Sequence, residues 1–321
     1  MKEILGKIDA LALKIKNHKE YSQVIHSKFI SYLNEEALKH SVDMELTGEK
    51  KHLPKKQFQK EKRISLLNLK EAGDYLEKNG LSFYTVSMLG KKIEPDKNLT
   101  PIRLKEITYG DMFEPPSPLT LHNHLDNLVY FLENSKEEHP VVRATRAHLG
   151  IVEIHPFMDG NGRAARLIQN FCLEEKGLPP AIISSNESEF YRGLMSAVMH
   201  ERYSKPETHF NHSIQENNFN LYIATKVLSS LTDLETELLT KKNYKIILNN
   251  LSSKEILFRV KKEIVKAVHS QTDSGVKVSK APFSGNSAEL YYRGKLGSEF
   301  FTSPLKRLSK KYNFDYEIVK D

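Results

Sequence analysis

The sequence predicts a mainly helical protein with a small α/β domain at its C-terminal end. Apolar residues recur at helical spacing along most of the first 240 residues. Farther on, residues 276–280 and 314–319 alternate as strands do, and residues 255–269 and 304–312 have helical spacing. The charge changes as well: residues 241–321 hold 17 Lys and Arg against 8 Asp and Glu, while the whole chain carries +7. These observations separate a small basic domain, 240–321, from the helical part.

Composition is that of a soluble globular protein, with 39% hydrophobic and 28% charged residues. No apolar run approaches the length of about 18 residues that a membrane helix needs. The first residues lack the long apolar core of a secretory signal. Cys172 is the single cysteine and cannot form an internal disulfide. We therefore expect a cytoplasmic protein with no membrane contact.

The helical part divides into an N-terminal region, 1–100, and a core, 101–225. Amphipathic helices are expected over residues 1–46, 66–76, 82–89 and 121–133, and His139-Pro140 opens another helix. Residues 102–109 have strand character instead, Gly110-Asp111 is a turn signal, and a proline-rich stretch ends at Pro118. This pattern predicts a short β-hairpin, against the simpler alternative of a surface loop.

The most informative stretch is residues 155–166, HPFMDGNGRAAR, between two helical patterns. Pro156 ends the first helix, and the loop leads into the N-terminus of the next. A helix N-terminus has unpaired N–H groups and a partial positive charge, which suit an anion. Gly160 and Gly162 permit close approach of a ligand. The sequence therefore predicts an anion site at this loop.

Four charged or titratable side chains surround that anion site. Arg163 and Arg166 are three residues apart, so both face one side, and arginine binds phosphate oxygens in bidentate fashion. Asp159 is a natural magnesium ligand beside a phosphate. His155 can move a proton near neutral pH. Together these residues predict phosphoryl or nucleotidyl transfer.

Three other interpretations of the loop were weighed. An EF-hand would place Phe157 and Ile168 at its first and last ligand positions, and neither can bind calcium. A Walker phosphate loop needs Gly-Lys-Ser/Thr, which is absent. The remaining alternative is that His155 and Asp159 only cap a helix and shape a turn, with no chemical role.

Residues 155–166 match, position for position, the motif HxFx(D/E)GNGRxxR, and the chain resembles the Fic (filamentation induced by cyclic AMP) family from about residue 40 to 225. The resemblance implies a Fic-type helical bundle that transfers AMP from ATP to a Ser, Thr or Tyr hydroxyl of a protein. It makes His155 the general base, Asp159 the magnesium ligand and Phe157 a core anchor. It further implies that the nucleotide is bound by the other motif positions, Gly160, Asn161, Gly162, Arg163 and Arg166.

The resemblance also implies a candidate inhibitory helix. The family pattern is (S/T)xxxE(G/N); Ser41 and Glu45 fit it, but Leu46 departs from it. A glutamate here would pair with Arg166 and deny it to the γ-phosphate. Ser31 and Glu35 form a weaker alternative.

Further expectations follow from the same resemblance. The hairpin becomes a flap over about 107–113, with Thr108, Tyr109 and Gly110 positioning the target. Asn170 and Tyr191 are candidates for the nucleotide pocket, although Tyr191 is about as well explained as a core aromatic. The protein itself is a candidate target, a homodimer stays open, and removal of AMP at the same site is the close alternative. For the basic C-terminal domain, a winged helix and nucleic-acid binding are expectations to be tested, as is a DNA-binding regulator that only senses nucleotide.

Overall fold

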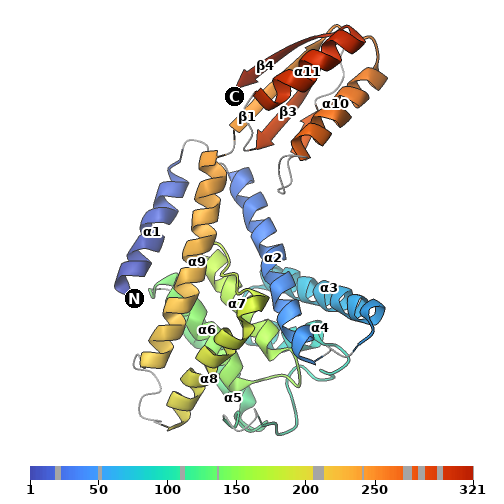
Figure 1. The fold of residues 1–321 in the computed structure, drawn as a ribbon. Helices are drawn as coiled ribbons and strands as arrows, with labels where there is room; N and C mark the ends of the chain where they lie inside the picture. Colours follow the sequence, from blue (N-terminus) through green and yellow to red (C-terminus); the bar gives the residue numbers. More distant parts are fainter. Residues whose placement is uncertain are drawn as a thin grey trace. The chain divides into compact units, whose positions relative to one another are not determined.

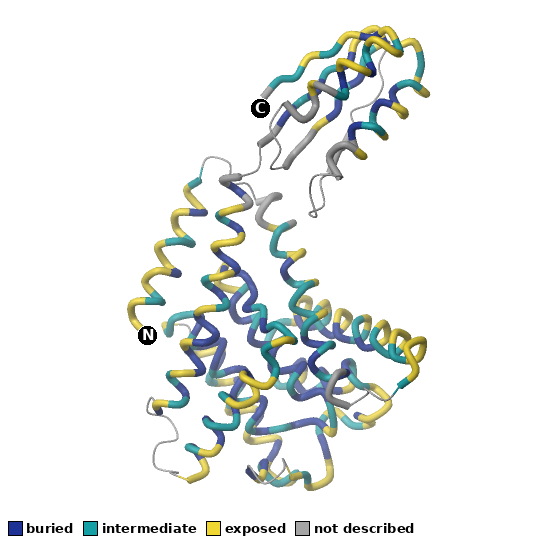
Figure 2. Tube along the Cα trace, viewed as in Figure 1, coloured by how far each residue is buried: buried dark blue, intermediate teal, exposed yellow. Residues whose placement is uncertain are grey.

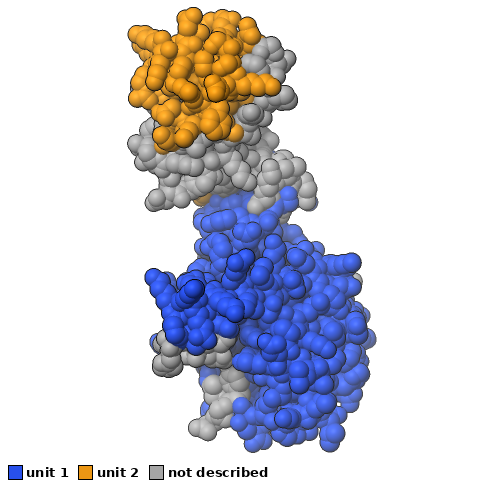
Figure 3. Space-filling model, turned by 90° about the vertical axis from the view of Figure 1, so that its right-hand side faces the viewer, with its two compact units in different colours: residues 1–234 blue, residues 235–321 orange. Residues whose placement is uncertain are grey.

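The chain forms two compact units, Met1–Leu234 and Glu235–Asp321 (Figure 3). The computed structural model describes residues 1–18, 23–49, 53–108, 113–135, 137–204, 213–240, 242–269, 277–280, 286–294 and 299–320. Both ranges that the sequence separated, 1–100 and 101–225, lie within the first unit. In the described part of the chain, no helix has the length and apolarity to cross a bilayer.

The first unit is built from helices (Figure 1). They are α1 (Lys2–Lys16), α2 (Gln23–Glu49), α3 (Lys55–Asn79), α4 (Phe83–Ile93), α5 (Leu121–Asn134), α6 (Pro140–Ile154), α7 (Asn161–Glu174), the 3-10 turn η1 (Ser185–Glu187), α8 (Ser188–Ser204) and α9 (Ile214–Thr240). This confirms the mainly helical class predicted from the periodicity.

Helices α6 and α7 form the centre of this unit, and Figure 2 shows them largely buried. Ile151 of α6 and Ile168 of α7 are fully buried. The small side chains of Ala164 and Ala165 let α7 approach its neighbours closely, since they add little bulk at the contact. The rigid helix pair thus holds the loop that joins α6 to α7.

The ends of α6 follow from the residues that stand there. His139 caps its N-terminus, where its Nδ1 accepts a hydrogen bond from the Val141 N–H, and Pro140 takes the first helical position. His155 adopts the left-handed conformation at the C-terminal cap, with φ 49°. That reversal turns the chain out of the helix and into the loop.

The strand expected over 102–109 as the first half of the hairpin is absent from its described part, whereas Phe113, beyond the expected turn, lies in a β-bridge. Residues 102–108 contain no strand. The backbone N–H of Arg103 donates to the Pro156 carbonyl at 2.8 Å, so it is committed to the loop after α6 and not to a partner strand. Tyr109 and Gly110 lie outside the described residues.

The second unit is a small α/β fold. Its elements are β1 (Lys242–Asn249), α10 (Lys254–His269), β2 (Lys277–Lys280), β3 (Ala288–Gly294), α11 (Glu299–Tyr312) and β4 (Asp315–Lys320). The described strands form one antiparallel sheet in the order β2-β3-β1-β4. The βαββαβ sequence with this order is the ferredoxin-like arrangement. The α/β class is as expected. The winged-helix candidate is wrong, because the strand order β2-β3-β1-β4 is that of the ferredoxin-like arrangement.

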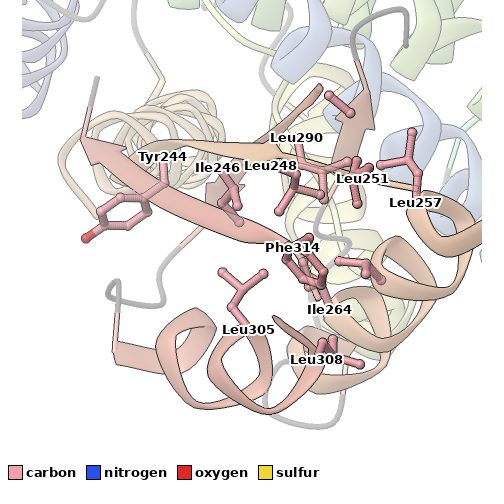
Figure 4. Close-up of a cluster of buried hydrophobic side chains, with 12 residues drawn as sticks. Tyr244, Ile246, Leu248, Leu251, Leu257, Ile264, Leu290, Leu305, Leu308 and Phe314 are labelled. Atoms are coloured by element: carbon pink, nitrogen blue, oxygen red, sulfur yellow. The ribbon is translucent and has the colours of Figure 1, made fainter. Parts of the chain in front are cut away.

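One face of this sheet carries the core of the second unit (Figure 4). Ile246 and Leu248 of β1 and Leu290 of β3 point to that face, as period-two alternation requires. Leu257 and Ile264 from α10 and Leu305 and Leu308 from α11 fill the same cluster. Both helices therefore cover a single face, and their other sides lie away from this core.

Candidate active site

The loop between α6 and α7 is held closed by its own asparagine. The Asn161 side chain accepts a hydrogen bond from the Phe157 N–H and donates one to the Phe157 carbonyl, both at 2.9 Å. Phe157 is 1% exposed and packs tightly on Gly90. A Cβ added to Gly90 would lie 2.3 Å from the Phe157 ring. The ring thus anchors the loop, and Asn161 shapes it through its side chain.

Asn98, which the sequence did not single out, clamps the same loop from outside. Its Oδ1 accepts from the Met158 N–H at 2.9 Å, and its Nδ2 donates to the carbonyls of Asp159 and Gly90, each at 2.9 Å. Asn98 is 2% exposed, and a buried amide with all these partners fixes backbone geometry firmly.

Arg103 is a second clamp that sequence reasoning missed. It is 1% exposed, and its Nε donates to the His155 carbonyl at 2.8 Å. Its two Nη atoms donate to the carbonyls of Lys105 and Pro116. Arg103 therefore ties His155 to both ends of the segment in which the flap was expected.

His155 is placed to act as a base. Burial above all, helped by the charge of Arg103, lowers its pKa to about 4, against the opposing effects of the Val152 carbonyl and of Asp159. The imidazole is therefore neutral near pH 7. Nδ1 lies 3.2 Å from the Val152 carbonyl, so the geometry assigns the proton to Nδ1 and the lone pair to Nε2.

Asp159 is an ionised carboxylate at the start of α7. Burial raises its pKa, but the Lys97 hydrogen bond and the positive charges of Arg163 and Lys97 outweigh that effect and lower it. Oδ1 accepts from the Gly160 N–H at 2.5 Å and lies 3.3 Å from Arg163 Nη2, while Oδ2 contacts Lys97 Nζ. Lys97 is a further residue that the sequence did not identify.

The donor set fits magnesium bound mainly by a nucleotide. The described residues contain no group of three or more His, Cys, Asp or Glu that could hold a metal. Magnesium commonly keeps its waters and uses one or two carboxylates plus substrate phosphates, and Asp159 is one such carboxylate.

Gly160 and Gly162 leave room at the anion site. Gly160 has φ 87°, and a Cβ there would lie 2.9 Å from Ile93. A Cβ on Gly162 would lie 3.1 Å from Glu45 Oε1 and 3.3 Å from Arg166 Nη1. Side chains at either position would crowd the space above the N-terminus of α7.

The two arginines of the motif have different surroundings. Arg163 is 4% exposed, and its Nη1 donates to Glu94 Oε1 at 2.5 Å. Arg166 is also buried, and α2 supplies most of its partners. Its Nε donates to Ser41 Oγ at 2.8 Å, and its Nη2 donates to Glu45 Oε1 at 2.8 Å.

Glu45 is charged in this position. Burial raises its pKa, but the nearby arginines, Arg166 above all, lower it on balance. Glu35 lies farther along α2, where it lines a groove of about 600 Å³ together with Ser31 and Asn170, and Arg166 lines the same groove. Of the two candidate glutamates, Glu45 is thus the one in contact with Arg166.

Of the remaining candidates, Asn170 lines one groove together with Arg163 and Arg166. Tyr191 is 1% exposed, and its hydroxyl accepts from Arg166 Nη1 at 3.3 Å and lies 2.8 Å from His148 Nε2, so it supports the arginine from the core. Asn170 Oδ1 accepts from the Ala181 N–H at 3.1 Å. Thr108 is exposed and lies in no helix or strand.

A neutral base, an ionised carboxylate and two arginines thus surround a glycine-rich helix N-terminus. These are the parts of a phosphoryl- or nucleotidyl-transfer site. Residues 85–173 match the model of the Fic/DOC family. Over these residues the chain is therefore similar to Fic domains.

Curated relatives share this part of the sequence. The chain is 38% identical over 112 residues to the protein adenylyltransferase Fic of Drosophila grimshawi, and 38% identical over 122 residues to that of Aedes aegypti. The matches cover 34% and 36% of this chain and 23% of each relative. The chain thus spans less than a quarter of the length of the curated relatives it matches.

Solved structures show the same fold. A Fic domain containing signaling protein from Bacteroides thetaiotaomicron has a TM-score of 0.57 at 19% identity, covering 74% of this chain and 98% of its own. A Fic family protein from Desulfovibrio desulfuricans has a TM-score of 0.54 at 14% identity, covering 97% of this chain and 87% of its own.

Proposed function

We propose that this chain transfers AMP from ATP to a hydroxyl group of a protein. The observation that carries the proposal is the neutral His155 beside the glycine-rich N-terminus of α7. The names of the curated relatives support the same activity. ATP is then the substrate, and a Ser, Thr or Tyr side chain is the acceptor.

In the proposed reaction, Nε2 of His155 takes the proton of the acceptor hydroxyl. The oxygen forms a bond to the α-phosphorus, and the bond from that phosphorus to the bridging oxygen breaks, releasing pyrophosphate. The N–H groups at the start of α7, with Gly160 and Gly162, bind the phosphates, and Arg166 binds the γ-phosphate. Magnesium, held by Asp159, supplies charge neutralisation of the phosphates when bound.

The target is positioned by the segment after Arg103. Arg103 donates hydrogen bonds to the carbonyls of Lys105 and Pro116, near the two ends of this segment, and to the carbonyl of His155, and so joins the segment to the loop. We assign Thr108, Tyr109 and Gly110 to a flap that aligns an extended target segment through main-chain hydrogen bonds. A segment of this same chain is one candidate target.

Glu45 serves as an inhibitor in this proposal. It holds the guanidinium of Arg166 that a γ-phosphate needs, and it carries the same sign of charge as that phosphate. Nucleotide binding in the transfer orientation therefore requires Glu45 to leave Arg166.

Removal of AMP is the second candidate activity. It is favoured by one observation, the ionised carboxylate of Glu45 near Gly162. Such a group can orient a water molecule for attack on the phosphorus of an AMP-modified hydroxyl.

Intact mass after incubation with ATP and magnesium tests the proposal. We expect a gain of one AMP unit in the Glu45→Gly variant, little in the wild type and none in the double variant that adds His155→Ala. Equal gains in wild type and Glu45→Gly would remove the inhibitory role. If no variant gains mass, but the wild type releases AMP from a pre-modified target and Glu45→Gly does not, removal is the activity.

A further inference from the structure

The two helices of the second unit present one exposed basic surface. On α10 the buried positions, Leu257, Val260 and Ile264, pack on the sheet. Positions spaced by four residues lie on another side of this helix and are exposed: Lys254, Phe258, Lys262 and Lys266. Phe258 is 68% exposed, so an aromatic ring stands in a row of cations.

Helix α11 lies beside α10 and extends this surface. Arg307 Nη2 is 3.6 Å from Glu263 Oε2, and Arg259 lies close enough to Tyr312 to lower the pKa of its hydroxyl. These contacts align the two helices side by side. We define the basic helical face as the exposed cations of both helices, of which Lys266 and Arg307 also lie beside Glu263: Lys254, Arg259, Lys262, Lys266, Lys306, Arg307, Lys310 and Lys311.

The other side of the unit has a different charge. Glu289 of β3 and Glu317 of β4 flank Ile247 in register, on the sheet face opposite the helices. Lys245 on that face is already paired with Glu289, at 2.6 Å. The carboxylates described on this face make it less attractive to a polyanion than the helices are.

We propose that the basic helical face binds single-stranded nucleic acid. The lysines and arginines contact phosphates, and the ring of Phe258 stacks on an unpaired base. Cations alone would fit any polyanion, but an exposed aromatic side chain one helical turn from Lys254 and from Lys262 adds a contact that bases provide. A duplex hides its base faces, so a single strand fits this combination better. The inference is independent of the reaction proposed for the first unit.

Fluorescence anisotropy of the full chain with a labelled oligonucleotide of about 12 nucleotides tests this, using DNA and RNA in separate arms. The charge variant is Lys262→Glu with Lys310→Glu. Its matched control is Lys78→Glu with Lys91→Glu, two exposed lysines of the first unit. We expect the charge variant to bind at least about tenfold more weakly and to lower the salt slope of log K by roughly 1.4, since each lost phosphate contact removes about 0.7. The control should bind as the wild type does.

Phe258→Ala separates stacking from charge. We expect it to weaken binding by roughly 5- to 100-fold with an unchanged salt slope, because stacking releases no counterions. Thermal unfolding of each variant checks that the second unit is intact. The proposal is overturned if the control loses as much affinity as the charge variant, or if Phe258→Ala binds normally. It is also overturned if polyglutamate, duplex DNA or anionic lipid vesicles bind the face more tightly than the single strand.

Discussion

Lys97 lies where a divalent cation would have to approach Asp159. Oδ1 of Asp159 already accepts from Gly160 and lies near Arg163, so Oδ2 is the oxygen that remains for magnesium, and Lys97 Nζ contacts it. The Lys97 side chain is 49% exposed and that of Asp159 is 19% exposed. For so exposed a pair the ion-pair energy is at most about 1 kcal/mol.

Replacing Lys97 with Met should therefore ease magnesium binding. In the wild type, magnesium must displace the ammonium group of Lys97, which costs the ion-pair energy. In Lys97→Met this cost is absent, so the magnesium concentration at half-maximal binding should fall by about two- to fivefold. The measurement is a magnesium titration of the binding of a fluorescent ATP analogue, which does not depend on turnover. Lys91→Met, at an exposed position of the neighbouring helix, is the control. A midpoint that stays constant or rises in Lys97→Met refutes the reasoning, because the lysine would then assist the nucleotide complex.

Three further predictions concern the loop and its clamps. Ser41→Ala removes one α2 group from Arg166, so ATP should bind more tightly than to wild type but less tightly than to Glu45→Gly; calorimetry giving an unchanged affinity would contradict this. His155 has a pKa of about 4 in the folded protein, so kcat/KM of Glu45→Gly should stay flat from about pH 5.5 to 8, and an inflection near 6.5 would contradict a neutral base. Arg103→Lys leaves at least two buried carbonyls without a donor and should lower the free energy of unfolding by about 2–4 kcal/mol in urea titrations; a loss under about 0.5 kcal/mol would show that water replaces the guanidinium.

Local signals predicted much of the first unit. Helical spacing indicated residues 121–133, and α5 covers Leu121–Asn134. His139-Pro140 marked the start of α6, because a cap and a proline act within one turn. The motif placed the base, the carboxylate and the arginines on one loop and helix because these positions are close in sequence.

Long-range contacts were beyond local reasoning. Asn98 and Arg103 reach the loop across more than 50 residues, and neither belongs to a periodic pattern. Residues 102–108 alternate like a strand, yet the buried guanidinium of Arg103 determines their path. In the second unit, β2 and β4 were expected, but β1 and β3 were not. Without these two central strands the sheet order cannot be derived, so the sequence alone leaves a winged helix possible.

Arg166 links stability to the proposed inhibition. A cation this deeply buried needs an anionic partner, because removing one member of a buried pair leaves an uncompensated charge. Glu45 fills that need in the structure, with Ser41 and Tyr191 completing the shell. A γ-phosphate can fill it equally well, so the proposed activation is an exchange of one anion for another at a fixed guanidinium. Removing the carboxylate of Glu45 should then lower the stability of the nucleotide-free protein and also raise its affinity for the nucleotide. A glutamate that only held two helices together would lower the stability without raising that affinity, so the two opposite effects identify a competing inhibitor.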